Sequence, residues 1–265
     1  MAHPNRKERT RKLQATDRFW VLPYVRTMTN HLRRLLAGFI LFATEFAITL
    51  TLGTAGVVAF LALSREVFDQ DAATFDAAAF RWVRQLLGAG RQQWVEAVTF
   101  LASRNFITVA GLVLVAWLLL VHRHRWYSLL VPVVALGSIT LNLLLKQIYQ
   151  RPRPLLPLTS ASGLSFPSGH AMISASFYGL LIYFAWTSLR RPAVRYAVVA
   201  TLSALIVLIG LTRVYLRVHY ATDVLAGFTA GLAWLIIAIP LLKQLEIQVG
   251  KRFKKQLQSA EKQSI

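Results

Sequence analysis

The sequence contains no cysteine, so thiols give no information on the redox compartment of the protein. Acidic residues are also scarce, because only 11 Asp and Glu stand against 30 Lys and Arg, and charged residues make up 15% of the chain. Hydrophobic residues make up 55%. A chain of 265 residues with so little charge cannot cover the surface of an ordinary soluble globule, so the composition indicates a membrane protein.

The excess of positive charge raises the question of nucleic-acid binding, but its distribution argues against that function. Residues 1–34 hold nine Lys and Arg and residues 243–265 hold six more, so half of the basic residues lie near the two ends. Neither end has a zinc-ligand spacing, a recognition-helix pattern or regularly spaced aromatic residues. We therefore expect two basic cytoplasmic tails that face solvent or lipid headgroups, and no nucleic-acid partner.

Six apolar stretches are long enough to cross a bilayer as helices, which needs about 20 residues each. They run over residues 35–63, 100–121, 127–145, 171–189, 193–211 and 224–242, and Arg104 and Asn105 interrupt the second. The segment FDAAAFRWVRQLL, residues 75–87, is expected to form a short amphipathic helix on the outer membrane surface between the first two spans. The predicted fold is therefore all-α: a polytopic six-helix membrane domain over residues 35–242.

The basic residues also predict the orientation. Six spans place both tails on one membrane face, together with the connections at 122–125 and 190–195, and these segments hold 20 of the 30 basic residues. By the positive-inside rule that face is cytoplasmic. Five further basic residues lie at the outer ends of the third to fifth spans, with Asp223 as their one acidic neighbour: Lys146, Arg151, Arg153, Arg213 and Arg217. This unbalanced charge indicates an anion site on the outer face.

Three outer segments carry candidate chemistry: KQIYQRPRP from Lys146, PSGH ending at His170, and TRVYLRVHYATD ending at Asp223. They resemble the three signature motifs of the type 2 phosphatidic acid phosphatase family, which also includes glucose 6-phosphatases and vanadium haloperoxidases. The family spacing matches Lys146 with Arg153, whereas Arg151 stands two residues too early. The residues that fit the other motifs are Pro167, Ser168, Gly169 and His170 in the second, and Arg213, His219 and Asp223 in the third.

The third motif departs from the family at Thr212, which replaces a serine. The hydroxyl is retained, but the packing of this helix end cannot be inferred from the family. Arg151 and Arg217 fall outside the family spacing, so we expect them to be interface anchors. Glu45 lies near the middle of the first span, and we expect a protonated or hydrogen-bonded packing residue there, with function as the alternative.

The motif residues also suggest phosphate chemistry without the resemblance. Lys146, Arg153 and Arg213 offer three cations to the equatorial oxygens of one phosphoryl group. The PSGH turn opens a helix, so the Ser168 hydroxyl and the N–H groups near Gly169 can bind an anion. Such a site stabilises negative charge without a metal ion, and we expect neither a metal nor another cofactor.

The two histidines suggest a division of labour. His219 and Asp223 are four residues apart, so the carboxylate can hold one ring nitrogen and leave the other free to attack phosphorus. The departing oxygen then needs a proton from a second group. The resemblance implies these roles: His219 forms a phosphohistidine, Asp223 orients it, and His170 serves the leaving group.

The expected function is removal of a terminal phosphate from a membrane lipid phosphate or diphosphate in the plasma membrane, at a site on the outer face. The family suggests undecaprenyl diphosphate, phosphatidylglycerol phosphate and phosphatidate as substrates, and we slightly favour the prenyl diphosphate by analogy. Two alternatives stay open: a transporter that binds phosphate without hydrolysis, and a haloperoxidase-like use of the same site. The sequence predicts no oligomeric state.

Overall fold

The structure is a computed structural model that describes the backbone of residues 6–67, 69–121 and 125–263. The side chains of residues 6–27 and 250–263 lie outside the described part, as do residues 122–124. The predicted basic character of the tails at 1–34 and 243–265 and of the connection at 122–125 therefore falls largely outside the described residues. These assignments stay predictions.

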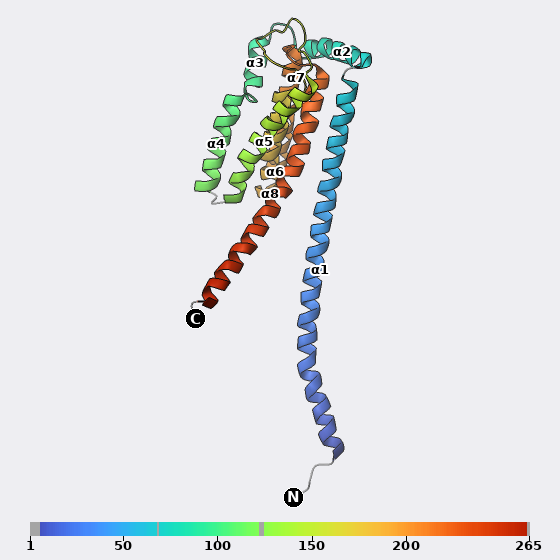
Figure 1. The fold of residues 1–265 in the computed structure, drawn as a ribbon, viewed down its shortest axis with the longest axis vertical. Helices are drawn as coiled ribbons and strands as arrows, with labels where there is room; N and C mark the ends of the chain where they lie inside the picture. Colours follow the sequence, from blue (N-terminus) through green and yellow to red (C-terminus); the bar gives the residue numbers. More distant parts are fainter. Residues whose placement is uncertain (1–5, 68, 122–124, 264–265) are drawn as a thin grey trace. The chain divides into compact units, whose positions relative to one another are not determined.

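The described residues form helices and no strands, which confirms the all-α prediction (Figure 1). The helices are α1 (Arg6–Glu66), α2 (Gln70–Leu87), α3 (Gln92–Phe100), α4 (Arg104–Leu120), α5 (Arg125–Tyr149), α6 (Gly169–Ser188), α7 (Pro192–Tyr215) and α8 (Ala221–Gln263). Six stretches are long and apolar enough to cross a membrane: Leu32–Glu66, Gln92–Leu120, Trp126–Tyr149, Gly169–Ser188, Pro192–Tyr215 and Ala221–Val249. The predicted number of spans is confirmed.

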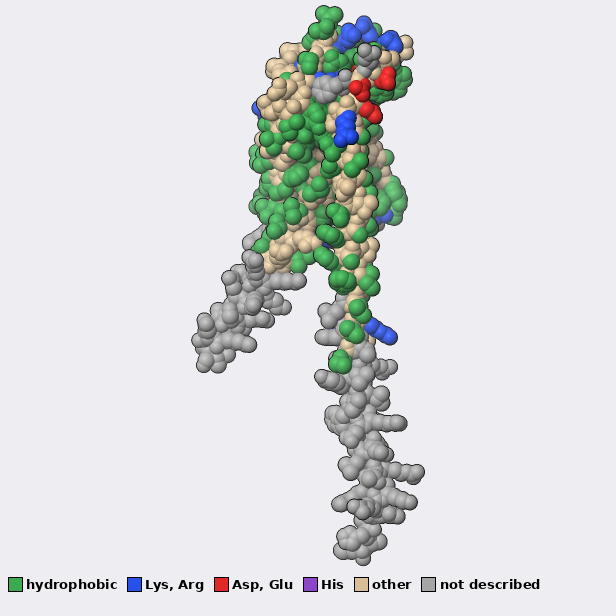
Figure 2. Space-filling view, turned by 45° about the vertical axis from the view of Figure 1, so that its right-hand side comes forward, with side chains coloured by type: hydrophobic (Ala, Val, Ile, Leu, Met, Phe, Trp, Pro, Cys, Tyr) green, Lys and Arg blue, Asp and Glu red, His purple; other side chains and the backbone are tan. Residues whose placement is uncertain are grey.

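The chain divides into two units, Met1–Ile48 and Thr49–Ile265. The first unit is the N-terminal part of α1 and includes Glu45, whose role stays a prediction. The second unit contains the rest of α1 and all other helices, and hence every motif residue. In Figure 2 hydrophobic side chains cover most of the flank of this bundle, and charged side chains gather at one end.

The second span is longer than the sequence predicted, and it is bent. It begins at Gln92 in α3, breaks at residues 101–103, and continues as α4. The break has a local cause, because the Ser103 side chain accepts a hydrogen bond from the backbone N–H of Phe106 at 3.2 Å and caps α4. Arg104 therefore begins a helix instead of interrupting one.

Helix α6 lies at the centre of the bundle and packs mainly against α7 and α8. Two glycines of α8, four residues apart, allow the closest approach. A Cβ atom on Gly227 would lie 2.6 Å from the Ser168 carbonyl oxygen, and one on Gly231 would lie 2.4 Å from that of Met172. Small residues at this spacing bring helix backbones together in membrane proteins. The start of α6, with PSGH, is thereby held against the start of α8.

The predicted amphipathic helix is α2, which begins five residues earlier than the predicted segment. Its buried face includes Ala72, Asp76 and Val83, whereas Phe75 and Trp82 are exposed. Apolar side chains therefore lie on both faces of the helix. Asp76 is an acid on the buried face, which shows that α2 covers a polar part of the bundle (Figure 1).

Candidate active site

The three motif segments meet at the end of the bundle that α2 covers (Figure 1). The first motif runs from the last turn of α5 into the following loop, the second ends in the first turn of α6, and the third runs from the end of α7 to the start of α8. The backbone N–H of Ser168 donates to the carbonyl oxygen of Asp223 at 3.0 Å, which joins the second motif directly to the third.

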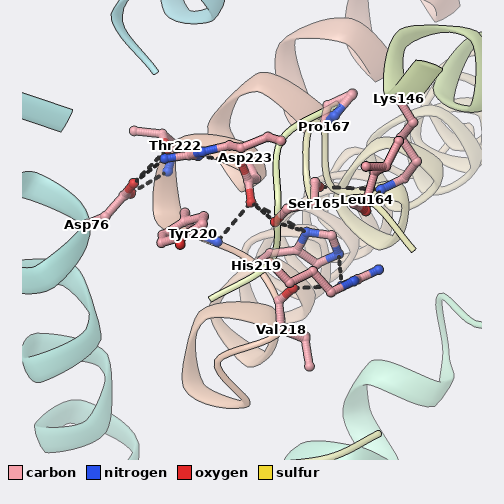
Figure 3. A network of polar contacts seen from close by, with 12 residues as sticks. Asp76, Lys146, Leu164, Ser165, Pro167, Val218, His219, Tyr220, Thr222 and Asp223 are labelled. Atoms are coloured by element: carbon pink, nitrogen blue, oxygen red, sulfur yellow. Dashed lines mark hydrogen bonds and ion pairs between the residues drawn. The ribbon is translucent and has the colours of Figure 1, made fainter. Parts of the chain in front are cut away.

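His219 lies between α7 and α8 and is only 3% exposed. Its Nδ1 lies 3.6 Å from Asp223 Oδ2 and 3.4 Å from Ser165 Oγ, and Ser165 Oγ in turn donates to the same carboxylate oxygen (Figure 3). On the other side of the ring, Nε2 lies 3.2 Å from Nη1 of Arg153. The Asp223 pairing that the four-residue spacing predicted is therefore present, with Ser165 as an additional bridge.

This geometry defines the tautomer of His219. Arg153 can only donate, so Nε2 must be an acceptor and carry a lone pair. The ring proton then lies on Nδ1, on the side of Ser165 and Asp223. The imidazole is neutral, and its free nitrogen points toward the guanidinium that would bind a phosphoryl group.

The electrostatic environment of His219 favours the same state. The pKa of the imidazole is lowered to about 4: burial is the largest cause, the charges of Arg213 and Arg153 act in the same direction, and Asp223 opposes the shift. Because the pKa lies below its ordinary value, the ring is neutral at every pH above about 5 and becomes charged only in acid. A neutral imidazole is therefore present across the physiological pH range.

We expect a histidine ring titration in this protein with a midpoint well below the ordinary value of about 6.5. Labelling all histidines with ¹⁵N and following their ring signals from pH 3.5 to 8 measures it, and the signal that disappears in His219→Gln identifies the residue. The NMR midpoint does not depend on the ionisation of any substrate. A midpoint for His219 at or above 6.5 would contradict the buried, neutral imidazole.

Two predicted phosphate ligands are buried donors without partners. Ser168 Oγ and Arg213 Nε have no hydrogen-bond acceptor among the residues that the structure describes. Arg213 is otherwise held by one bond, from Nη1 to Thr99 Oγ1 at 2.9 Å. Buried hydrogen-bond donors are nearly always paired, so two unpaired donors from different motifs indicate a ligand with several hydrogen-bond acceptors.

The other two predicted cations contact the loop that precedes PSGH. Lys146 Nζ donates to the carbonyl oxygen of Leu164 and lies 3.4 Å from that of Ser165. Arg153 donates from Nε to Gly163 O and from Nη2 to Ser162 O, both at 3.0 Å. The first motif therefore shapes the loop that leads into the PSGH turn as well as offering positive charge.

His170 lies in the first turn of α6 and lines a cavity of about 160 Å³ with Gly169, Asn142, Ser103, Arg104 and Ile107. Asn142 Nδ2 donates to the Pro167 carbonyl oxygen at 3.1 Å and so holds the PSGH turn. The cavity opens on the side of the site formed by α4, α5 and α6. His170 therefore faces a space where the rest of a substrate could lie.

The departure at Thr212 is small. Its hydroxyl donates to the carbonyl oxygen of Ile209 at 2.5 Å, one turn back in α7, and the side chain is fully buried. A serine could make the same bond, so the replacement leaves the neighbouring Arg213 at the end of the helix in place.

The prediction that Arg151 is an interface anchor is wrong. The residue is 8% exposed, and it makes ion pairs with Asp223 Oδ1 at 2.5 Å and with Asp76 Oδ2 at 3.0 Å. Asp76 and Ser165 are not among the predicted site residues. Ser165 could have been found as the hydroxyl residue three positions before Ser168, but Asp76 had no local signal that distinguished it from a surface acid.

Known proteins match both the sequence and the fold. The family model of the PAP2 superfamily matches residues 126–246. Phosphatidylglycerophosphatase B of Bacillus subtilis is 36% identical over 148 residues, which cover 54% of this chain and 72% of that protein. YbjG of Escherichia coli, whose undecaprenyl-diphosphatase name is provisional, is 26% identical over 146 residues, which cover 52% of this chain and 69% of that protein.

The crystal structure of a transmembrane PAP2 type phosphatidylglycerolphosphate phosphatase from Bacillus subtilis superposes with a TM-score of 0.67 at 27% identity, over 72% of this chain and 96% of that one. The helical membrane fold and the motif cluster thus define a membrane-embedded phosphatase. The chain belongs to the PAP2 superfamily. It is a multi-pass membrane protein and a lipid phosphate phosphatase.

Proposed function

We propose that the protein removes the terminal phosphate from a lipid phosphate or diphosphate through a phosphohistidine on His219, without a metal ion. One observation carries the proposal: Ser168 Oγ and Arg213 Nε are buried donors without partners, in the site where the free nitrogen of His219 faces Arg153. A phosphoryl group would satisfy these donors and present its phosphorus to the imidazole.

The first half-reaction transfers the phosphoryl group to the enzyme. The lone pair on His219 Nε2 attacks phosphorus, and the bond to the lipid oxygen breaks with its electron pair on that oxygen. His170 donates a proton to this oxygen, so the lipid leaves as a neutral alcohol, or as a lipid monophosphate when the substrate is a diphosphate. The imidazole of His219 then carries the phosphoryl group, and its Nδ1–H faces Asp223, which stabilises the positive charge.

The second half-reaction restores the enzyme. His170, now neutral, takes a proton from water as the water oxygen attacks phosphorus, and the P–N bond breaks with its electron pair on Nε2. Lys146, Arg153 and Arg213 balance the negative charge on the equatorial oxygens in both steps. The products are inorganic phosphate and the neutral His219 of the starting state.

A lipid panel tests the function and the substrate together. We expect purified protein in mixed micelles to release phosphate in the presence of EDTA, because three cationic side chains replace the charge of a metal ion. Vanadate, which can adopt the five-coordinate geometry of phosphorus in the transition state, should inhibit phosphate release. Loss of all activity in EDTA that only added Mg²⁺ restores would contradict the metal-free mechanism.

The similarity to the Bacillus subtilis enzyme supports phosphatidylglycerophosphate as the first substrate to test, and the weaker similarity to YbjG supports undecaprenyl diphosphate as the second. Phosphatidate completes the panel. The slight preference for a prenyl diphosphate from the sequence therefore gives way to the glycerolipid. A transporter without hydrolysis would not need an oriented His219 next to Asp223, and it would release no phosphate from any member of this panel.

We also propose that the site faces the outer side of the plasma membrane and that both termini are cytoplasmic, because the basic residues of the tails follow the positive-inside rule. The natural chain has no cysteine, so single cysteines at Ser160 and Ser259 can be labelled without background. An impermeant maleimide applied to intact cells should label Ser160→Cys only. Labelling of Ser259→Cys, with Ser160→Cys protected, would reverse the orientation.

A further inference from the structure

We propose that Arg151 is a positioning residue that orients Asp223 on His219, and that Asp76 on α2 holds Arg151 in place. The inference rests on the proposed role of His219 as the nucleophile. The inference gives a role in orienting His219 to α2, a helix that bears no family motif.

The contacts form a chain from α2 to the nucleophile. Asp76 Oδ2 accepts from Arg151 Nη2 at 3.0 Å, and Arg151 Nη1 donates to Asp223 Oδ1 at 2.5 Å. The other oxygen of Asp223, Oδ2, accepts from Ser165 Oγ and from the backbone N–H of Tyr220, and it lies 3.6 Å from His219 Nδ1. Figure 3 shows Asp76 on one side of Asp223 and His219 on the other.

The two oxygens of Asp223 therefore have different tasks. Arg151 occupies Oδ1, which fixes the rotation of the carboxylate about its last bond and turns Oδ2 toward His219. Without Arg151, Oδ1 would lose its donor, and Ser165 Oγ and the Tyr220 N–H, which both bond to Oδ2, would be the remaining described donors to the carboxylate. The groups on the Nδ1 side of the ring, Ser165 Oγ and Asp223 Oδ2, would then be held less firmly. The ring of His219 would then populate the other tautomer, which has no lone pair on Nε2.

The charges of the buried side chains support the same positioning role for Arg151. Asp76 and Asp223 are 1% and 0% exposed, and Arg151 lies between them. Two buried carboxylates close together need a cation nearby, and the Arg151 guanidinium pairs with both of them. The Arg151 guanidinium therefore stabilises the negative charge of Asp223, and this charge in turn stabilises His219 when the imidazole becomes positively charged.

Further contacts hold the Arg151 guanidinium in place. Its Nη1 also donates to Thr222 Oγ1 at 2.8 Å, and its guanidinium lies over the ring of Tyr220, 4.0 Å from the centroid. Asp76 accepts in addition from the N–H and the hydroxyl of Thr222, both at 2.9 Å, and so caps the first turn of α8. The described contacts of Arg151 lead to Asp223, Asp76 and Thr222, so we infer that it acts through Asp223. Arg153, which lies 3.2 Å from His219 Nε2, is the arginine placed to bind the phosphoryl group.

The test compares Arg151→Gln, Arg151→Lys and Asp76→Asn with Arg217→Gln. Arg217 is the matched control, because its guanidinium also packs on α2, 5.3 Å from the Phe80 ring, but no described contact joins it to Asp223. For the preferred lipid we expect Arg151→Gln to lower kcat about 100-fold and to change KM less than about threefold. Asp76→Asn should lower kcat about 10-fold, Arg151→Lys should fall between wild type and Arg151→Gln, and the control should stay near wild type.

A double variant tests whether the two residues act as one chain. If Asp76 acts only by holding Arg151, Asp76→Asn combined with Arg151→Gln should be no slower than Arg151→Gln alone. If the double variant instead loses activity by the product of the two single-variant factors, that part of the proposal is overturned. A loss confined to KM would also overturn it, because it would make Arg151 a direct substrate ligand, and so would kcat within threefold of wild type in both single variants.

A second readout does not depend on catalysis. The ¹⁵N signals of the His219 ring should report one Nδ1–H tautomer in the wild type and in Arg217→Gln, and a mixture in Arg151→Gln and in Asp76→Asn. If no lipid phosphate is hydrolysed by the wild type, the proposed function fails, and this tautomer measurement still decides the positioning role. An unchanged tautomer in Asp76→Asn and Arg151→Lys, which retain most of the buried contacts, would overturn it even if Arg151→Gln failed to fold.

Discussion

Replacement of His219 by glutamine should reduce phosphate release by about 10⁴-fold or more, with every lipid substrate. The reason is that, in the proposed mechanism, Nε2 forms the bond to phosphorus, and glutamine has no imidazole nitrogen to replace it. Rapid quenching after addition of a ³²P-labelled lipid should trap an acid-labile, alkali-stable label on the wild-type protein and none on His219→Gln. A label of the same kind on the variant would require another nucleophile.

The matched variant is His170→Gln, which should lose about 10²–10⁴-fold with a lipid alkoxide leaving group, the range for a general acid. A substrate whose leaving group needs no proton, such as an aryl phosphate, should recover part of the rate of His170→Gln and none of that of His219→Gln. His170 lines the cavity beside the site, where the leaving oxygen would lie, whereas Nε2 of His219 faces Arg153. Equal rescue of both variants would contradict the assignment of acid and nucleophile.

Replacement of Arg153 by alanine should lower kcat/KM by about 10³-fold, because its guanidinium lies next to the attacking nitrogen and would contact an equatorial oxygen of the transferred phosphoryl group. Much of the loss should appear in kcat, since the charge on these oxygens changes most in the transition state. Arg217→Ala is the control for removal of a positive charge near the site, and it should stay within about threefold of wild type. Similar losses in both variants would mean that the general positive potential, not a specific contact, drives the reaction.

Arg153→Ala also removes hydrogen bonds that support the fold, so a loss of folding must be measured separately from a loss of activity. Its guanidinium donates to the carbonyl oxygens of Ser162, Gly163 and Val218, so it joins the PSGH loop to the third motif. Arg153→Lys restores the charge but not the three-way bonding. We expect Arg153→Lys to recover folding, as measured by thermal unfolding in detergent, and only a small part of the activity.

Much of the architecture could be predicted from local sequence. Hydropathy identified all six spans, because a helix in a bilayer must present about 20 apolar residues in a row whatever its neighbours are. The amphipathic pattern at residues 75–87 predicted α2 for a similar reason. The ends of the spans were less predictable: the second span starts eight residues earlier than expected, at Gln92, and a cap at Ser103 divides it into α3 and α4.

The sequence by itself determined the membrane class and the residues of the three motifs, because hydropathy and short spacings are properties of neighbouring positions. The four-residue spacing likewise predicted that Asp223 lies beside His219, although His219 precedes α8 and is not on a helical turn with Asp223. Only the tertiary structure decided that Arg151 is buried between two carboxylates. Its partners Asp76 and Asp223 lie 75 and 72 residues away along the chain, and nothing in the local pattern distinguishes Arg151 from an anchor in the headgroups. Burial of that ion pair depends on α2 packing over the end of the bundle, which is a property of the fold and not of any segment alone.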